Sequence, residues 1–163
     1  MELFDEVDIN DNVIGVTHKQ EAHTTGKLHR VGAVYVFNDT GKLYVQVHKK
    51  SGGLYDHSVG GHISQGETYA VGTKREAEEE LGITQSLEEL SVFYSDEGTE
   101  MQHMFGLYMC VADRSWVFIP NDEVEEIIPM ELSEIIKLMN NEPHRFTRGF
   151  INTMAEYNRL ISQ

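Results

Sequence analysis

A pair of strand-like segments separated by a turn signal constrains the fold of this chain more than any other feature. Residues 31–37 and 43–47 are rich in valine and aromatic residues, and Asn38-Asp-Thr-Gly41 lies between them. Asparagine, aspartate and glycine favour tight turns because they readily adopt the backbone conformations that turns require. The sequence therefore predicts a β-hairpin over residues 31–47.

Further strand and helix patterns extend along the whole chain. Strands are predicted at residues 3–9, 13–16, 91–94, 104–111 and 126–128, and helices at 66–81, 131–140 and 146–161. In the last helix one stripe is apolar, which predicts packing against the core; it consists of Phe146, Phe150, Met154, Tyr157 and Ile161. Strands dominate, with helices between and after them. We therefore expect an α+β domain with a mixed β-sheet and helices packed on its faces.

Length, cysteine content and charge narrow the class of protein. The 163 residues fit a single domain, residues 1–163, and the only cysteine, Cys110, excludes an internal disulfide and a thiolate metal cluster. The N-terminus lacks a signal-peptide pattern and no apolar run approaches the ~20 residues of a membrane span, so we expect a cytoplasmic protein. A formal charge of −14 argues against a nucleic-acid polymer as partner, but a small anionic substrate is compatible if cations bridge it.

The predicted helix at residues 66–81 carries an unusual concentration of glutamates. On a helical wheel Glu76, Glu79 and Glu80 share one face, while Glu78 points away toward solvent. A separate apolar stripe faces the core; it consists of Ala70, Ala77 and Leu81. Clustered carboxylates suit Mg²⁺ or Mn²⁺, which would turn their repulsion into attraction. The alternative is an acidic helix face that is simply solvated.

The residues before these glutamates add to the pattern. Gly60 and Gly61 give a flexible backbone, and Glu67 is favourably placed near the helix N-terminus. Arg75 is a cation that can either pair with Glu67 or organise the carboxylates; the sequence leaves both open.

The segment from Gly61 to Ile83 resembles the Nudix box. That motif consists of glycine, five residues, glutamate, seven residues, then Arg-Glu-aliphatic-x-Glu-Glu-x-Gly-aliphatic. The matching positions are Gly61, Glu67, Arg75, Glu76, Ala77, Glu79, Glu80, Gly82 and Ile83. Only Ala77 is smaller than the usual aliphatic residue. The hairpin before the box and the segment after residue 122 also resemble this family, whose fold is an α/β/α sandwich around a mixed sheet.

The resemblance implies an enzyme that hydrolyses a nucleoside diphosphate linked to another group, or a related organic diphosphate. It implies that Mg²⁺ or Mn²⁺ is held by Glu76, Glu79, Glu80 and the Gly61 carbonyl, with Glu67 and Arg75 as a supporting pair. The ion would bridge the diphosphate, offset its charge and activate a water. A carboxylate would accept the proton from that water; Glu76, Glu79, Glu123 and Glu126 are the candidates.

Two segments, residues 22–30 and 55–62, resemble the isopentenyl-diphosphate isomerase branch of the Nudix superfamily. In that branch the histidines matching His23, His29 and His62 help to bind a metal, and three imidazoles could hold Zn²⁺, Mn²⁺ or Fe²⁺. His103 is a weaker candidate for the same site. The alternative is that these are loop histidines satisfied by backbone groups. The other histidines are expected to be surface or supporting residues; they are His18, His48, His57 and His144.

The chain departs from the isomerases at the residue that does their chemistry. Their essential cysteine just before the box is matched by Gly60, and Cys110 lies in a predicted strand, where it is expected to be a small buried residue. The hydrolase box, in contrast, is complete. We therefore expect a hydrolase, with a non-catalytic Nudix-fold binding module and an isomerase as the alternatives.

Substrate recognition is less well defined by the sequence. Relatives often carry two arginines after the glutamine of the second hairpin strand, whereas this chain has Lys49 and Lys50 in that region. These lysines either bind the diphosphate as point charges or are ordinary solvated lysines. Three aromatic residues could stack a base, but packing is the more common role; they are Tyr55, Tyr69 and Trp116. Homodimers are common among relatives, so a homodimer is a further expectation.

Overall fold

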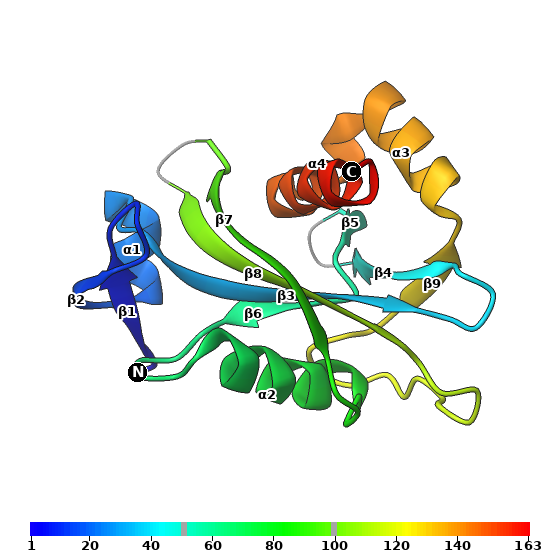
Figure 1. The fold of residues 1–163 in the computed structure, drawn as a ribbon, viewed down its shortest axis with the longest axis horizontal. Coiled ribbons are helices and arrows are strands. Elements are labelled where there is room, and N and C mark those ends of the chain that lie inside the picture. The colour runs from blue at the N-terminus through cyan, green and yellow to red at the C-terminus, as the bar shows by residue number, and fades with distance from the viewer. Residues whose placement is uncertain (50–51, 99–100) are drawn as a thin grey trace.

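The computed structural model describes residues 1–49, 52–98 and 101–163. Within these residues nine strands form one sheet, shown in Figure 1. The strands are β1 (Leu3–Val7), β2 (Val13–His18), β3 (His29–Phe37), β4 (Leu43–His48), β5 (Leu54–Asp56), β6 (Val59–His62), β7 (Glu88–Asp96), β8 (Gln102–Val111) and β9 (Ile127–Met130). The helices are α1 (Lys19–Thr25), α2 (Tyr69–Leu81), α3 (Leu132–Asn141) and α4 (Arg148–Ile161), with a short 3-10 helix η2 (Pro143–Arg145).

Strand β3 is the centre of the sheet. It pairs in parallel with β8 along its whole length, from His29 opposite His103 to Phe37 opposite Val111. It pairs antiparallel with β1, β4 and β6. The outer pairs β1–β2, β4–β5, β4–β9 and β7–β8 are also antiparallel. The sheet is therefore mixed, as the sequence predicted.

Helices cover both faces of this sheet. Tyr35 and Phe37 of β3 belong to one buried cluster together with residues of α3 and α4. Val34 and Val36 point to the other face, where they pack in a second cluster with Ala77 and Leu81 of α2. In Figure 1 α2 accordingly lies on one side of the sheet, and α3 and α4 on the other. Successive β3 side chains alternate between the two buried clusters, which confirms the expected α+β sandwich.

The predicted hairpin is present, and its turn is built by asparagine. Phe37 pairs with Leu43 across the two strands. The Asn38 side-chain oxygen accepts hydrogen bonds from the backbone N–H groups of Thr40 and Lys42 at 3.0 and 2.9 Å. Such side-chain bonds stabilise the turn conformation locally, which explains why the sequence signal was reliable here.

Several predicted boundaries differ from the observed ones for local reasons. Helix α2 begins at Tyr69 rather than residue 66, because Gly66 has a φ of 79° and the Thr68 hydroxyl caps the helix by accepting a hydrogen bond from Val71 N at 3.2 Å. Strand β1 ends at Val7 because the Asp8 carboxylate accepts hydrogen bonds from the backbone of the following turn.

Four short elements of the described structure were not predicted: α1, β5, β6 and η2. Helix α1 has 7 residues and is capped at its start by the His18 ring. Two predicted core positions are also exposed, Ala70 on α2 and Ile161 at the end of α4. Among the described helices, none combines the length and the apolar composition that a membrane span needs.

Candidate functional site

Three carboxylates converge at the surface of α2. Glu76 and Glu79 of the helix and Glu123 of the segment before β9 each offer an oxygen atom, and these atoms lie within 4.8 Å of one another. We call this group the glutamate cluster. The Glu76 side chain is 13% exposed, and that of Glu79 is 48% exposed. Burial, opposed by Arg75, raises the pKa of Glu76, and the nearby charge of Glu79 adds to this effect. A cation at this position would remove the repulsion.

Glu80 lies apart from the glutamate cluster, on the buried side of α2. Its Oε1 accepts a hydrogen bond from Gln46 Nε2 at 2.8 Å, and its Oε2 accepts one from Gly60 N at 3.2 Å. Burial raises the pKa of Glu80 to about 8. The wheel placed Glu80 with Glu76 and Glu79, but the helix turns this carboxyl inward, toward the sheet.

Arg75 makes both of the contacts that the sequence left open. Its Nε and Nη2 donate to the two oxygens of Glu67, at 3.2 and 2.9 Å. Its Nη1 lies 2.8 Å from Glu76 Oε1 and 3.5 Å from Glu79 Oε2. The bond to Glu67 is the main reason why the pKa of Arg75 is raised above its ordinary value. Glu67 therefore holds the guanidinium, which in turn orients the carboxylates of the cluster.

The backbone at Gly61 passes very close to the glutamate cluster. A Cβ atom at this position would lie 2.2 Å from Glu76 Cδ, which is far inside van der Waals contact. A residue with a side chain would therefore have to displace the Glu76 carboxylate. At Gly60, in contrast, the nearest atom to an added Cβ is His57 Nδ1 at 3.5 Å, an ordinary contact.

A small cavity of about 60 Å³ lies beside Glu123 and is lined by His48 and Lys49, among other residues. Lys49 Nζ forms an ion pair with Glu126 Oε2 at 3.2 Å, and both side chains are about half exposed. Lys50, the other predicted substrate-binding lysine, lies outside the described residues.

A second group of candidate ligands lies at the start of β3, next to the strand segment that approaches the glutamate cluster. His23 of α1, His29 of β3, His62 of β6 and His103 of β8 each offer a ring nitrogen within 4.8 Å of the others. We call this group the histidine cluster. The Nε2 atoms of all four rings are buried and have no hydrogen-bond partner among the described residues. The resemblance predicted His23, His29 and His62 together, with His103 as a weaker candidate. In the structure the parallel pairing of β8 with β3 brings His103 beside His29.

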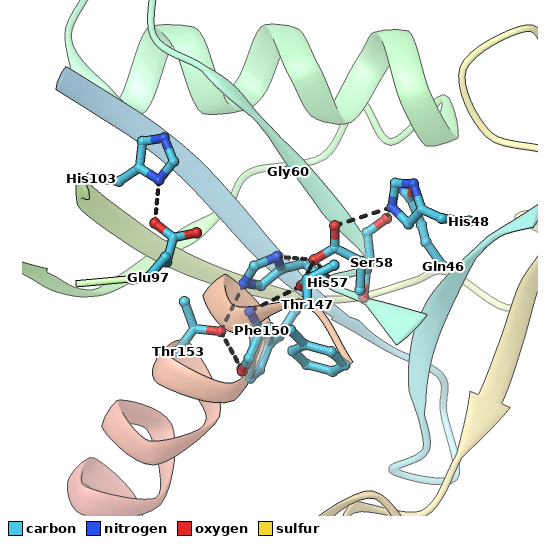
Figure 2. Close-up of polar contacts among 12 residues, drawn as sticks. Gln46, His48, His57, Ser58, Gly60, Glu97, His103, Thr147, Phe150 and Thr153 are labelled. Atoms are coloured by element: carbon cyan, nitrogen blue, oxygen red, sulfur yellow. Dashed lines mark hydrogen bonds and ion pairs between the residues drawn. The ribbon is translucent and has the colours of Figure 1, made fainter. Parts of the chain in front are cut away.

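The protonation of the histidine cluster follows from its neighbours. His29 Nδ1 lies 2.9 Å from the Lys27 carbonyl oxygen, to which it must donate. His103 Nδ1 contacts the Glu97 carboxylate, as Figure 2 shows. Burial lowers the pKa of His29 to about 4 and that of His62 to about 2, and the neighbouring histidines add to both shifts. The His29 and His62 rings are therefore neutral at physiological pH.

Sequence reasoning gave no hint of a buried polar network between β5 and α4. The Asp56 carboxylate accepts from Thr147 Oγ1 at 2.8 Å and contacts His57 Nδ1 at 2.7 Å. On its other side His57 Nε2 lies 2.8 Å from Thr153 Oγ1, which also contacts the Tyr35 hydroxyl. Figure 2 shows His57 between the strand and the helix. Thr153 is fully buried, so these hydrogen bonds connect the interior side of α4 to the sheet. His57, which was expected to be a surface or supporting residue, lies within this network.

The remaining candidates have packing roles. Trp116 donates from Nε1 to the Leu81 carbonyl oxygen at 2.9 Å. Tyr69 donates to Asp11, and Tyr55 accepts a hydrogen bond from Arg145. Cys110 is a buried free thiol whose pKa is raised by burial to about 11. His144 is exposed.

Comparison with known proteins places this geometry in a family. The NUDIX domain family matches residues 27–150. The chain is 33% identical to an isopentenyl-diphosphate Delta-isomerase of Pectobacterium atrosepticum, over 91% of this chain and 87% of that protein. It is 33% identical to an uncharacterized Nudix hydrolase of Yersinia pestis, over 83% and 76%. A crystal structure of a Deinococcus radiodurans protein superposes with a TM-score of 0.70 at 26% identity, over 86% of this chain and 90% of that one. The chain therefore belongs to the Nudix family.

Proposed function

We propose that this protein is a Mg²⁺- or Mn²⁺-dependent hydrolase that cleaves the diphosphate bond of a nucleoside diphosphate linked to another group, or of a related organic diphosphate. The family as a whole suggests hydrolysis of nucleoside diphosphate derivatives. The observation that carries the proposal is the glutamate cluster: three carboxylate oxygens lie within 4.8 Å of one another beside an arginine that keeps them in place.

The residues around this cluster fit a hard divalent cation. Glu76 and Glu79 supply carboxylate oxygens. The resemblance implies the Gly61 carbonyl as a further ligand, and the Gly61 backbone passes close to Glu76. The resemblance implies Glu80 as another ligand; to bind the ion its carboxyl would have to lose its proton and turn away from Gln46 and Gly60. The ion would offset charge on the diphosphate and lower the pKa of a bound water.

The chain itself supplies orientation and proton transfer. Arg75 and Glu67 hold Glu76 in one position, so that the reacting groups stay aligned. Glu76, Glu79 or Glu123 accepts the proton of the attacking water, since all three belong to the glutamate cluster. Glu126 is a weaker base candidate because it is paired with Lys49. We infer that Lys49, which lines the small cavity beside Glu123, contacts the substrate.

An isomerase is the second candidate, and one specific observation favours it: a relative with 33% identity carries the name isopentenyl-diphosphate Delta-isomerase. Against it stands Gly60, which replaces the cysteine implied by the resemblance and has no group that can transfer a proton. A non-catalytic binding module has no need for three mutually repelling carboxylates.

Chromatographic detection of the cleavage products from a panel of substrates tests the proposal. The panel contains nucleoside diphosphates, sugar nucleotides, dinucleotides and prenyl diphosphates, each with Mg²⁺ or Mn²⁺ and then with EDTA. Cleavage of a sugar nucleotide or dinucleotide gives two monophosphates, and cleavage of a simple diphosphate gives a monophosphate and inorganic phosphate. We expect metal-dependent cleavage that Glu79→Gln abolishes. Glu78→Gln is the matched control, because Glu78 is exposed on the same helix outside the cluster. Isomerisation of a prenyl diphosphate without phosphate release would instead establish the isomerase, and tight binding without turnover would establish the module.

We further propose that His23, His29 and His62 bind a second metal ion, as the isomerase resemblance implies.

We also propose that residues 1–163 form one domain and that the protein is cytoplasmic, which agrees with the free thiol of Cys110. The expected homodimer stays a prediction that gel filtration with light scattering can test.

A further inference from the structure

Strand β7 leaves one edge of the sheet free. Among the described strands it pairs only with β8, and from Ser91 to Asp96 this pairing runs in unbroken register. Edge strands are commonly guarded by proline, lysine or a bulge. Residues 91–96 contain neither proline nor lysine, and the bulge of β7 lies before them, between Glu89 and Ser91. This stretch of the edge is therefore open to a further strand.

Alternate residues of β7 direct their backbone groups to the open edge. Glu97 N donates a hydrogen bond across the turn that joins β7 to β8, so the backbone of Glu97 faces β8. Successive residues of a strand face opposite edges, so Val92, Tyr94 and Asp96 face away from β8. The Asp96 carbonyl agrees with this, because it accepts a hydrogen bond from Asn152 Nδ2 of α4 at 2.9 Å. The outward backbone groups of Val92 and Tyr94 have no backbone partner within the described part of the chain.

Helix α4 forms the second wall of a groove along this edge. Figure 1 shows α4 packed on the sheet beside β7. A cavity of about 470 Å³ is lined by residues 93–96 of β7 and by one stripe of α4, which consists of Asn152, Ala155, Glu156 and Arg159. Two hydrogen bonds hold the walls together: Ser91 Oγ donates to Glu156 Oε1 at 2.9 Å, and Asn152 Nδ2 donates to Ser95 Oγ at 2.9 Å. The small side chain of Ala155 leaves room between them.

A free strand edge beside a groove fits an extended peptide. Peptides that add a strand to a sheet edge gain affinity from main-chain hydrogen bonds and specificity from pockets for alternate side chains. Residues 91–96 span about 20 Å at ~3.3 Å per residue, which matches about six residues of an extended peptide. Val92 and Tyr94 supply the main-chain partners, and the half-buried Phe93 adds an apolar surface to the groove.

The charges around the groove select a basic peptide. The carboxylates of Asp96 and Glu156 line it, and Glu88 and Glu89 lie at the start of the same strand. Arg159 is the only cation among the described lining residues, and it is paired with Glu156 at 2.6 Å. The formal charge of −14 disfavours a second copy of the chain in this place, because two such surfaces repel. A positively charged partner is attracted instead.

We propose that the groove between β7 and α4 binds an extended basic peptide of a partner protein, which adds a strand to the free edge of β7. Phe93 packs against the buried cluster that contains residues of α3 and α4, whereas α2 packs on the other face of the sheet. The peptide groove is therefore separate from the glutamate cluster, and its test does not depend on hydrolysis.

Binding of capped, fluorescent hexapeptides tests the proposal by fluorescence polarisation. The probes alternate valine with lysine, threonine with lysine, and valine with glutamate. We expect saturable binding of a lysine peptide, weaker at high salt, and none of the glutamate peptide. Methylation of alternate peptide nitrogens should weaken binding about tenfold or more for the set that faces β7, and less for the other set. No binding of either lysine peptide, preference for the glutamate peptide, or equal binding of both methylated forms would overturn the proposal.

Amide hydrogen exchange locates the peptide on the protein. The outward amides of Val92 and Tyr94 should exchange rapidly in the free protein and be protected when the lysine peptide is bound. Protection elsewhere, with these two amides unprotected, would overturn the proposal. This measurement needs no variant, so it decides the question even where a substitution prevents folding.

Variants test the two walls of the groove separately. Ala155→Trp fills the groove from α4 and should abolish binding, whereas Ala70→Trp, at an exposed alanine of α2, is the matched control that leaves it unchanged. Val92→Pro removes one outward N–H while the ladder to β8 stays intact, so it should weaken binding more than Val92→Ala does. Unchanged affinity in Ala155→Trp, or equal affinity of the two Val92 variants, would overturn strand addition in this groove.

Discussion

The glutamate cluster lies at the surface of α2, whereas the histidine cluster is enclosed between α1 and the central strands. The first offers oxygen ligands of like charge, beside an arginine that orients them. The second offers neutral nitrogen ligands whose outer atoms are held by a carbonyl and a carboxylate. Two consecutive residues of β6 thus belong to different candidate metal sites: Gly61 contacts the glutamate cluster and His62 is part of the histidine cluster.

Loss of one oxygen ligand of the glutamate cluster should reduce hydrolysis more than any other substitution considered below. Glu76→Gln takes away a charged ligand and the partner of Arg75. Loss of several kcal/mol of transition-state stabilisation corresponds to a fall in hydrolysis of about 10³-fold. The zinc content of the same protein should stay unchanged, because the histidine cluster is intact. A steady-state assay and metal analysis of one sample test both statements; loss of both ions would show that the clusters are not independent.

Gly61→Ala should have the next largest effect. The added Cβ would lie 2.2 Å from Glu76 Cδ, so the carboxylate has to move. Misplacement of a ligand by about 1 Å lowers activity about 10²-fold. Gly60→Ala is the control, because its Cβ meets only an ordinary contact at 3.5 Å. Equal kcat/KM values for the two alanine variants would contradict the close approach on which this prediction rests.

Arg75→Lys should have a smaller effect. Lysine keeps the positive charge but cannot bind both oxygens of Glu67 while reaching Glu76. We expect kcat to fall about tenfold and the Mg²⁺ requirement to shift to higher concentration. Activity equal to that of the unaltered enzyme would show that charge alone, without the fork of hydrogen bonds, organises the cluster.

The last prediction concerns the stability of the metal-free protein and involves no loss of activity. The pKa of Glu80 is about 8 in the folded chain and 4.5 as its ordinary value. Between these values the unfolded chain releases the proton and the folded chain retains it, so stability falls as pH rises, by at most about 1.4 kcal/mol per pH unit. Glu80→Gln removes this slope. Urea unfolding in EDTA from pH 5 to pH 8 measures it, and parallel curves for the two proteins would refute the shift.

Local patterns predicted much of the fold. The hairpin of β3 and β4 and the helix α2 were found because their signals lie in neighbouring residues, such as the asparagine turn and the helical spacing. Helix α1 was missed because 7 residues are too few for a clear period, so His23 was assigned to the edge of a loop rather than to a helix.

The two clusters show where sequence reasoning stops. The resemblance named Glu76 and Glu79 as metal ligands, whereas Glu123 was named only as a candidate base. Its place beside the two ligands depends on the path of a distant segment, which only the fold determines. Glu80 was grouped with them on the wheel, yet Gln46 and Gly60 hold it on the buried side. His103 was predicted only as a weaker candidate ligand, yet it lies in the histidine cluster. Its position follows from the parallel pairing of β8 with β3, which leaves no signal in the sequence of either strand.

The main prediction is that the glutamate cluster binds Mg²⁺. It is measured by calorimetric titration of Mg²⁺ into zinc-loaded protein with a non-hydrolysable diphosphate present. Zinc occupies the histidine cluster beforehand, so the heat reports the glutamate cluster alone. Binding is predicted for the unaltered protein and for Glu78→Gln, and its loss for Glu79→Gln. Absence of Mg²⁺ uptake in the unaltered protein, or equal uptake in Glu79→Gln, would contradict the account.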